Sequence, residues 1–186
     1  MYNYNAASRT ITTDRLILRP FAISDAECVS RLCNNYNIHK GTLALPYPYP
    51  IESALSWIPT HAENFENDKA YEFAITDKTT GALYGCMGLA NNKKHRNGET
   101  GYWVGEEFWG NGYASEALRA VIDFAFFEKG FHKVYARHFE SNPASGRVMQ
   151  NAGMVYEGRQ IDQVFKEGRY ETLLLYGIIN SEACSQ

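Results

Sequence analysis

The chain is poor in the features that mark metal sites, disulfide scaffolds and membrane proteins. Its four cysteines form no Cys-x-x-Cys pair and have no histidine at metal-ligand spacing. We therefore predict no metal site and interpret the cysteines as reduced, mostly buried thiols; they are Cys28, Cys33, Cys86 and Cys184. No stretch approaches the roughly eighteen apolar residues of a membrane helix, and residues 1–9 lack the basic start and apolar core of a signal peptide.

An excess of basic charge is also absent. The formal net charge is −3 at pH 7, whereas a nucleic-acid groove needs clustered lysine and arginine to displace counterions. The basic run at 93–96 lies between asparagine and glycine pairs and is typical of a solvated hairpin tip. We therefore expect no nucleic-acid partner, no membrane partner and a cytoplasmic location.

The composition is that of an ordinary globular protein. Hydrophobic residues make up 45% and charged residues 21% of the 186 positions, and no repeat or long linker divides the chain. The sequence thus predicts one domain over 1–186, with 1–10 as a loose tail.

Hydrophobic spacing predicts a mixed α/β protein. Helices are expected after a capping box at Ser24–Glu27 and over 51–65, which Pro59 should kink or divide into two. Further helices are expected over 115–129 and 143–152. The expected strands are 15–19, 71–76, 83–90, 99–104, 133–139, 154–160 and 170–179.

The run from Gly101 to Leu118 predicts a strand, a loop of alternating small residues and a helix start. Gly110, Gly112 and Ala114 allow the main chain to approach an anion, and the helix that follows begins with unpaired N–H groups and a positive dipole end. Neither the P-loop pattern nor the dinucleotide pattern Gly-x-Gly-x-x-Gly fits, because no lysine follows and Ser115 stands at the third glycine. Taken alone, the loop also fits an ordinary strand-to-helix connection.

A second motif follows the predicted strand 133–139. Asn142 is a good helix N-cap, Pro143 suits the first helical position and Gly153 lies just past the end. With both motifs at this separation, the chain resembles the GNAT superfamily of acetyl-CoA-dependent N-acetyltransferases. Within it, the chain is similar to the branch of the ribosomal-protein-alanine N-acetyltransferases, and the resemblance spans 13–176.

The resemblance implies a mixed, mostly antiparallel central sheet of about six to seven strands, flanked by helices, in which two neighbouring strands splay apart. Acetyl-CoA would lie in that cleft, with its pantetheine arm against the main chain of one strand end. Its pyrophosphate would lie on the loop amides, although the position that is usually Gln or Arg is Trp109 here. The implied cofactor-binding residues are Trp103, Val104, Gly110, Asn111, Gly112, Tyr113, Ala114, Ser115, Asn142 and Arg147.

Three residues are candidates for proton transfer. Glu99, at the head of the strand before the loop, is the candidate carboxylate base, with an exposed strand-end charge as the alternative. Ser145 is the candidate donor to the departing thiolate, and Tyr156 is its rival because several superfamily members use a tyrosine after this helix. A main-chain N–H near Val104 would polarise the thioester carbonyl. We assign no catalytic histidine.

The acceptor is expected to be a primary amine, most simply a protein N-terminus. An α-amine with a pKa near 7.8 is about 15% neutral at pH 7, whereas a lysine is neutral in only roughly 0.04% of molecules. A small amine such as a polyamine, amino acid or aminoglycoside remains an alternative, as does a non-catalytic acyl-CoA binding module. The acceptor slot is expected among 45–50, Trp57 and 165–170, and family habit suggests a homodimer.

Overall fold

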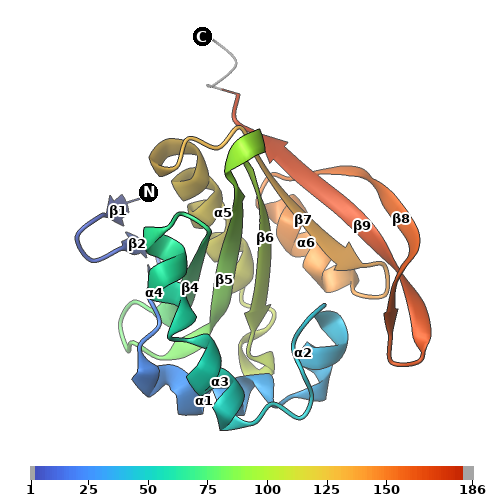
Figure 1. Cartoon of the computed structure of the whole chain (residues 1–186), viewed down its shortest axis with the longest axis horizontal. Coiled ribbons are helices and arrows are strands. Elements are labelled where there is room, and N and C mark those ends of the chain that lie inside the picture. The colour runs from blue at the N-terminus through green and yellow to red at the C-terminus, as the bar shows by residue number, and fades with distance from the viewer. Residues whose placement is uncertain (1–2, 182–186) are drawn as a thin grey trace.

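The computed structural model describes residues 3–181, which form one nine-stranded sheet with helices on both faces (Figure 1). The strand order is β1-β2-β3-β4-β5-β6-β7-β9-β8, and every pair is antiparallel except β6 with β7. The strands are β1 (Asn3–Asn5), β2 (Thr10–Thr12), β3 (Leu16–Arg19), β4 (Ala70–Asp77), β5 (Leu83–Asn92), β6 (Asn97–Val104), β7 (Lys133–Phe139), β8 (Val155–Lys166) and β9 (Arg169–Ile179).

Most helices lie where the sequence predicts them, but the helix at Tyr36–Gly41 was not predicted. Pro59 separates two short helices, as expected from its missing N–H. The helix expected over 115–129 begins earlier and changes to a π-helical turn at Phe124–Glu128. The α-helices are α1 (Ala26–Cys33), α2 (Tyr36–Gly41), α3 (Ile51–Trp57), α4 (Thr60–Glu66), α5 (Tyr113–Asp123) and α6 (Pro143–Asn151).

Two predictions for the first 27 residues are wrong. The expected loose tail over 1–10 contains β1 and the first residue of β2, and Tyr4 packs edge-on against Phe124 at 5.0 Å. The capping box at Ser24–Glu27 does not form. Instead, the Asp25 carboxylate accepts two hydrogen bonds from Arg19, at 2.8 and 2.9 Å, and one from the Ala22 N–H, so α1 starts without a side-chain cap.

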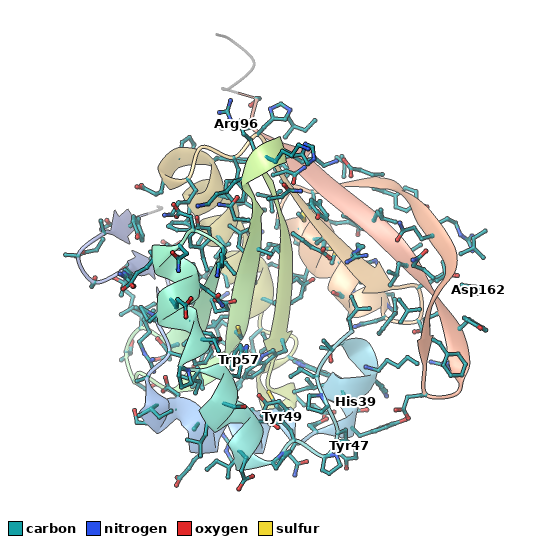
Figure 2. All side chains as sticks on the ribbon, viewed as in Figure 1. His39, Tyr47, Tyr49, Trp57, Arg96 and Asp162 are labelled. Atoms are coloured by element: carbon teal, nitrogen blue, oxygen red, sulfur yellow. The ribbon has the colours of Figure 1, made fainter. Side chains whose placement is uncertain are left out.

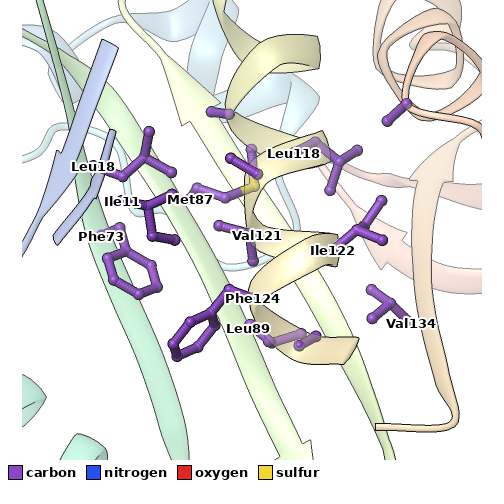
Figure 3. Close-up of a cluster of buried hydrophobic side chains, with 14 of the residues drawn as sticks. Ile11, Leu18, Phe73, Met87, Leu89, Leu118, Val121, Ile122, Phe124 and Val134 are labelled. Carbon is purple, nitrogen blue, oxygen red and sulfur yellow. The ribbon is translucent and has the colours of Figure 1, made fainter. Parts of the chain in front are cut away.

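Each face of the sheet carries its own core. The register aligns Phe73, Met87 and Tyr102 across β4, β5 and β6, and these side chains pack toward α5. Figure 3 shows this core, in which Leu118, Val121 and Ile122 of α5 lie over the strands. The next row, Ala74, Cys86 and Trp103, packs on the opposite face against α1, α2 and α3.

The cysteines and the basic run are largely where the sequence predicts them. Cys33 and Cys86 are buried and Cys28 is half-buried, all as free thiols, whereas Cys184 lies outside the described residues. Residues 93–96 form the tip between β5 and β6, with Arg96 in the left-handed region at φ 50°. Among residues 3–181, no helix is long and apolar enough to cross a membrane.

Candidate functional site

A cleft opens where β6 and β7 separate. The two strands pair only from Asn97–Lys133 to Glu99–Tyr135 and then diverge, and α2 lies beside the opening (Figure 1). Two adjoining cavities line the cleft, one of about 940 Å³ that we call the loop cavity and one of about 550 Å³ that we call the sheet cavity. Their shared residues include Gly41, Thr42, Tyr102, Trp103 and Ser145.

The glycine loop forms one wall of the loop cavity. Gly110 and Gly112 have φ values of 79° and 78°, a region that side chains with a Cβ rarely adopt, and α5 begins at the next residue, Tyr113. The first N–H groups of a helix have no partner within the helix, so they present donors and a positive dipole end to the cavity. This donor set fits a diphosphate. The lining residues here are Gly110, Gly112, Tyr113, Ala114 and Ser115.

Asn111 is not part of that wall. Its side-chain NH₂ donates to the carbonyl oxygens of Phe108 and Trp109, at 3.1 and 3.2 Å, which folds the loop onto itself. Its own carbonyl accepts a hydrogen bond from the Arg15 guanidinium at 2.9 Å. Asn111 therefore shapes the loop by its side chain, and only its main-chain N–H remains as a candidate for anion binding.

Arg15 and Glu116 brace the loop from outside, which the sequence did not reveal. The Arg15 Nε lies 2.7 Å from Glu116 Oε2, and the guanidinium stands 4.8 Å from the centre of the Tyr113 ring. Burial would raise the pKa of Glu116, but hydrogen bonds from Thr13 and Arg15 outweigh it and lower that pKa. The start of α5 is thus fixed by an ion pair from β3's N-terminal side.

The end of β6 offers main-chain groups to the cleft at Val104. The Gly105 N–H donates to the Tyr84 carbonyl of β5 at 2.8 Å. In an antiparallel pair, the main-chain groups of successive residues point alternately toward and away from the partner strand. The N–H and C=O of Trp103 therefore point to β5, and those of Val104 point to the cleft. The Trp109 indole N–H donates a hydrogen bond to the Val104 carbonyl oxygen at 2.7 Å. The predicted main-chain role of Trp103 therefore does not fit, because its carbonyl is turned to β5; its side chain lines both cavities.

Asn142 joins the two sides of the loop cavity. Its Oδ1 accepts from the Ser145 N–H at 3.4 Å as the predicted N-cap, and its NH₂ donates to the Gly41 carbonyl at the end of α2 at 3.2 Å. One amide hydrogen remains available to a ligand. Arg147, one turn further along α6, is exposed and lines the same cavity.

Ser145 lies at the junction of the cavities and contacts a residue that the sequence analysis missed. The Tyr102 hydroxyl is 2.8 Å from the Ser145 Oγ and 2.9 Å from its carbonyl oxygen. Burial raises the pKa of Tyr102, and the hydrogen bond to Ser145 offsets this only in part. When the phenol donates to the serine oxygen, the serine hydrogen is free to point into the cleft.

The structure separates Tyr156 from this junction. Tyr156 is 52% exposed on β8, packs edge-on against Tyr176 at 5.7 Å, and lines neither cavity. The reason is the strand order, because β9 lies between β7 and β8 and displaces β8 to the edge of the sheet. The sequence could not show this insertion.

Glu99 lines the sheet cavity, but its carboxylate already forms an ion pair with Arg137. The Arg137 guanidinium of β7 donates to both of its carboxylate oxygens, Nε to Oε1 at 2.7 Å and a second nitrogen to Oε2 at 3.0 Å. A bidentate pair of this kind supplies a charged hydrogen-bond donor to each oxygen of the carboxylate.

The predicted acceptor elements are only partly brought together. Leu45, Pro46, Tyr49 and Trp57 line the sheet cavity, whereas Tyr47 is 49% exposed and lies beside His39 at a ring distance of 5.8 Å (Figure 2).

The tip between β8 and β9 reaches α2 instead of the sheet cavity. The Lys166 ammonium donates to the carbonyl oxygens of His39 and Thr42, and His39 Nε2 lies 3.0 Å from Glu167 Oε1. The tip residues Lys166, Glu167 and Arg169 line the loop cavity.

Two further titratable residues line the sheet cavity. Burial raises the pKa of Glu72 on β4, and its buried Oε2 has no hydrogen-bond partner within residues 3–181. Burial lowers the pKa of His138, whose Nδ1 lies 2.8 Å from the Phe139 carbonyl, so the ring is neutral near pH 7. No group of three or more His, Cys, Asp or Glu among the described residues is placed to hold a metal ion.

Comparison with known sequences supplies the family. A sequence profile described as acetyltransferase (GNAT) domain matches residues 15–155. The chain is 31% identical over 170 residues to a Bacillus subtilis (strain 168) protein named uncharacterized N-acetyltransferase YoaA, with 91% of this chain and 96% of that protein covered.

Comparison with solved structures supports the fold. The chain resembles the ribosomal-protein-S5-alanine acetyltransferase from Vibrio fischeri with a TM-score of 0.82 and 21% identity, over 93% of this chain and 97% of that one. It also resembles the spermidine N-acetyltransferase from Vibrio cholerae in complex with CoA and spermine, with a TM-score of 0.78 and 23% identity, over 93% and 100%. The predicted antiparallel-dominated α/β sheet is confirmed, with nine strands among the described residues in place of six to seven.

Proposed function

Since the chain belongs to the GNAT family of N-acetyltransferases, which use acetyl-CoA, we propose that its acceptor is the α-amine of a protein or peptide N-terminus. The reaction moves the acetyl group from the thioester directly to the amine nitrogen. The amine loses two protons, one of which ends on the CoA sulfur and one in solvent.

The observation that carries this proposal is the charge of the sheet cavity. Arg137 neutralises Glu99, and burial keeps His138 uncharged. Among the described residues that line this cavity, Glu72 is then the carboxylate without an ion-pair partner. One uncompensated negative charge matches the single ammonium of an N-terminus. A polyamine carries several ammonium groups and would leave most of them unpaired in this cavity.

On the donor side, the geometry supports a main-chain binding site for acetyl-CoA. The amides from Asn111 to Ser115 would hold the pyrophosphate, with Arg147 near the phosphates and Asn142 donating to the pantetheine arm. The Val104 N–H would polarise the thioester carbonyl. Ser145, itself hydrogen-bonded to Tyr102, would donate a proton to the departing sulfur.

The test is acetyl transfer to three acceptors at pH 7: trialanine amide, spermidine, and a lysine blocked at its α-amine and carboxyl group. We expect the highest kcat/KM for trialanine amide. A higher value for spermidine would transfer the assignment to a polyamine acetylase. Tight acetyl-CoA binding without transfer to any primary amine would instead support an acyl-CoA binding module and overturn the proposal.

A further inference from the structure

Three neighbouring residues across the sheet, one glutamate and two glycines, form part of the wall of the sheet cavity. Glu72 of β4 is in register with Gly88 of β5, which is in register with Gly101 of β6. Register neighbours project their side chains to the same face, and this row lies two residues along from Ala74, Cys86 and Trp103. All three members of the row line the sheet cavity.

The two glycines keep the space beside Glu72 open. A Cβ at Gly101 would meet no atom within 4 Å, and one at Gly88 would make only ordinary contacts, 3.5 Å from the Gly101 carbonyl oxygen and 4.0 Å from the Glu72 Cγ. Glycine in a strand interior weakens the strand, so its presence marks a place where another group approaches closely. The sheet cavity therefore has room beside these glycines for a small polar group in contact with the Glu72 carboxylate.

Glu72 and Glu99 share this face but differ in what surrounds them. Glu99 holds Arg137 through both oxygens. Glu72 has its Oε2 buried without a hydrogen-bond partner among residues 3–181. A buried acceptor without a partner is unfavourable because it has lost its hydrogen bonds to water, and an ammonium ligand would remove that cost.

We propose that Glu72, and not Glu99, binds the primary ammonium of the acceptor and accepts its first proton. This inference rests on the proposed function. The carboxylate of Glu72 takes one proton from R–NH₃⁺, giving R–NH₂ and the neutral acid. The nitrogen lone pair then forms the C–N bond to the thioester carbon, and the C–S bond breaks.

The remaining protons balance the step. After the C–N bond forms, the nitrogen carries one excess proton. The Ser145 hydroxyl gives its proton to the CoA sulfur as the C–S bond breaks and takes up the excess proton from the nitrogen, so the serine ends unchanged. Glu72 returns its proton to solvent through the open side of the sheet cavity. The sum is R–NH₃⁺ plus acetyl-CoA giving the amide, CoA thiol and one proton.

The electrostatic setting suits this role. Burial raises the pKa of Glu72 and outweighs the opposing effect of its own backbone N–H, and this brings the pKa of the carboxylate closer to that of an α-amine, near 7.8. The titratable and charged groups that line the same cavity are Tyr49, Cys86, Glu99, Tyr102, Arg137 and His138.

The test compares E72Q with E99Q, and with E63Q as an exposed control on α4, using acetyl-CoA and trialanine amide. E72Q is expected to lower kcat/KM about 100-fold at pH 7, the scale of a lost general base. The deficit should shrink toward pH 9, where more of the amine is already neutral. E99Q should lose less than tenfold, and E63Q should match wild type.

Calorimetry on the CoA-bound protein supplies a readout that needs no turnover. Trialanine amide should bind at least fivefold more weakly to E72Q than to wild type, while CoA affinity stays the same. Equal peptide affinity and equal rates in wild type and E72Q would overturn the inference, as would the larger, pH-dependent loss occurring in E99Q. Glu72-dependent binding without turnover in wild type would overturn the proposed function alone.

Discussion

The loop cavity and the sheet cavity meet at Ser145, but they present different chemical groups to a ligand. The loop cavity presents main-chain groups at the start of α5 and at the end of β6. The sheet cavity presents side chains, among them Glu72, Glu99 and Arg137. The contrast indicates why one fold can keep its donor while changing its acceptor. A substitution always replaces a side chain, whereas it removes a main-chain donor only where the backbone conformation depends on the residue type.

The largest expected effect tests whether the loop cavity depends on backbone conformation. Gly112→Val places a β-branched residue at φ 78°, which strains the backbone by roughly 1–3 kcal/mol and should shift the loop amides. We expect acetyl-CoA affinity to fall about 100-fold by calorimetry. Gly81→Val is the matched control, since Gly81 has φ 74° in the β4–β5 turn and lines neither cavity. Equal affinity losses in both variants would refute the assignment.

The next effect concerns stability beside the sheet cavity. His61 packs against Trp57 at 4.3 Å and Phe21 at 5.4 Å, and burial lowers the pKa of His61 to about 4. The same imidazole in the unfolded chain takes up a proton below about pH 6.5. Between those values the unfolded state binds more protons, so stability falls as the pH drops from 6.5 to 4.

His61→Phe keeps the ring and removes this titration. Relative to wild type, its free energy of unfolding should gain about 2 kcal/mol on going from pH 7 to pH 5, a factor of roughly 30 in the unfolding equilibrium. Urea titration at both pH values measures the difference. An identical pH dependence in the two proteins would show that His61 has the same pKa in the folded and unfolded states.

A smaller effect tests the junction of the cavities. Ser145→Ala should lower kcat about tenfold, the value of one hydrogen bond that strengthens as the thiolate leaves, with acetyl-CoA affinity unchanged. Tyr102→Phe should act in the same direction. If the two hydroxyls work as a unit, the double variant will lose no more than the worse single variant. Fully additive losses would separate their roles.

The smallest effect tests whether the net charge of the sheet cavity selects an acceptor with one ammonium over a polyamine. Arg137→Met leaves Glu99 unpaired and adds a second uncompensated carboxylate to the sheet cavity. The ratio of kcat/KM for spermidine over trialanine amide should rise about fivefold, since one further charge in a partly solvated cavity is worth about 1 kcal/mol. Arg159→Met, on an exposed β8 arginine 3.6 Å from Glu140, should leave the ratio unchanged.

Much of the loop cavity was predictable from sequence because its features are local. Gly110 and Gly112 are needed for positive φ, and Asn142 with Pro143 marks a helix start within a few residues. Trp103 failed as a main-chain contact, since sequence does not give the phase of the β5–β6 hydrogen bonds.

The sheet cavity was much less predictable. Glu72 alternates with Tyr71 and Phe73, so it resembled a solvent-facing position of a hairpin, and its burial depends on helices that precede it in the chain. Gly88 and Gly101 did give a signal for this cavity, because glycines inside predicted strands can mark a place where a ligand approaches the backbone closely. Glu99 and Arg137 are 38 residues apart, and nothing local indicates that they pair.

By itself, the amino-acid sequence determined the order of helices and strands from β3 onward apart from α2, the glycine loop and the capped start of α6, because periodicity, backbone dihedral preference and capping act over a few residues. Only the tertiary structure decided which carboxylate is left unpaired, which hydroxyl reaches Ser145 and where Tyr156 lies. Those outcomes depend on strand order and on contacts between distant segments, and local chemistry holds no information about long-range pairing.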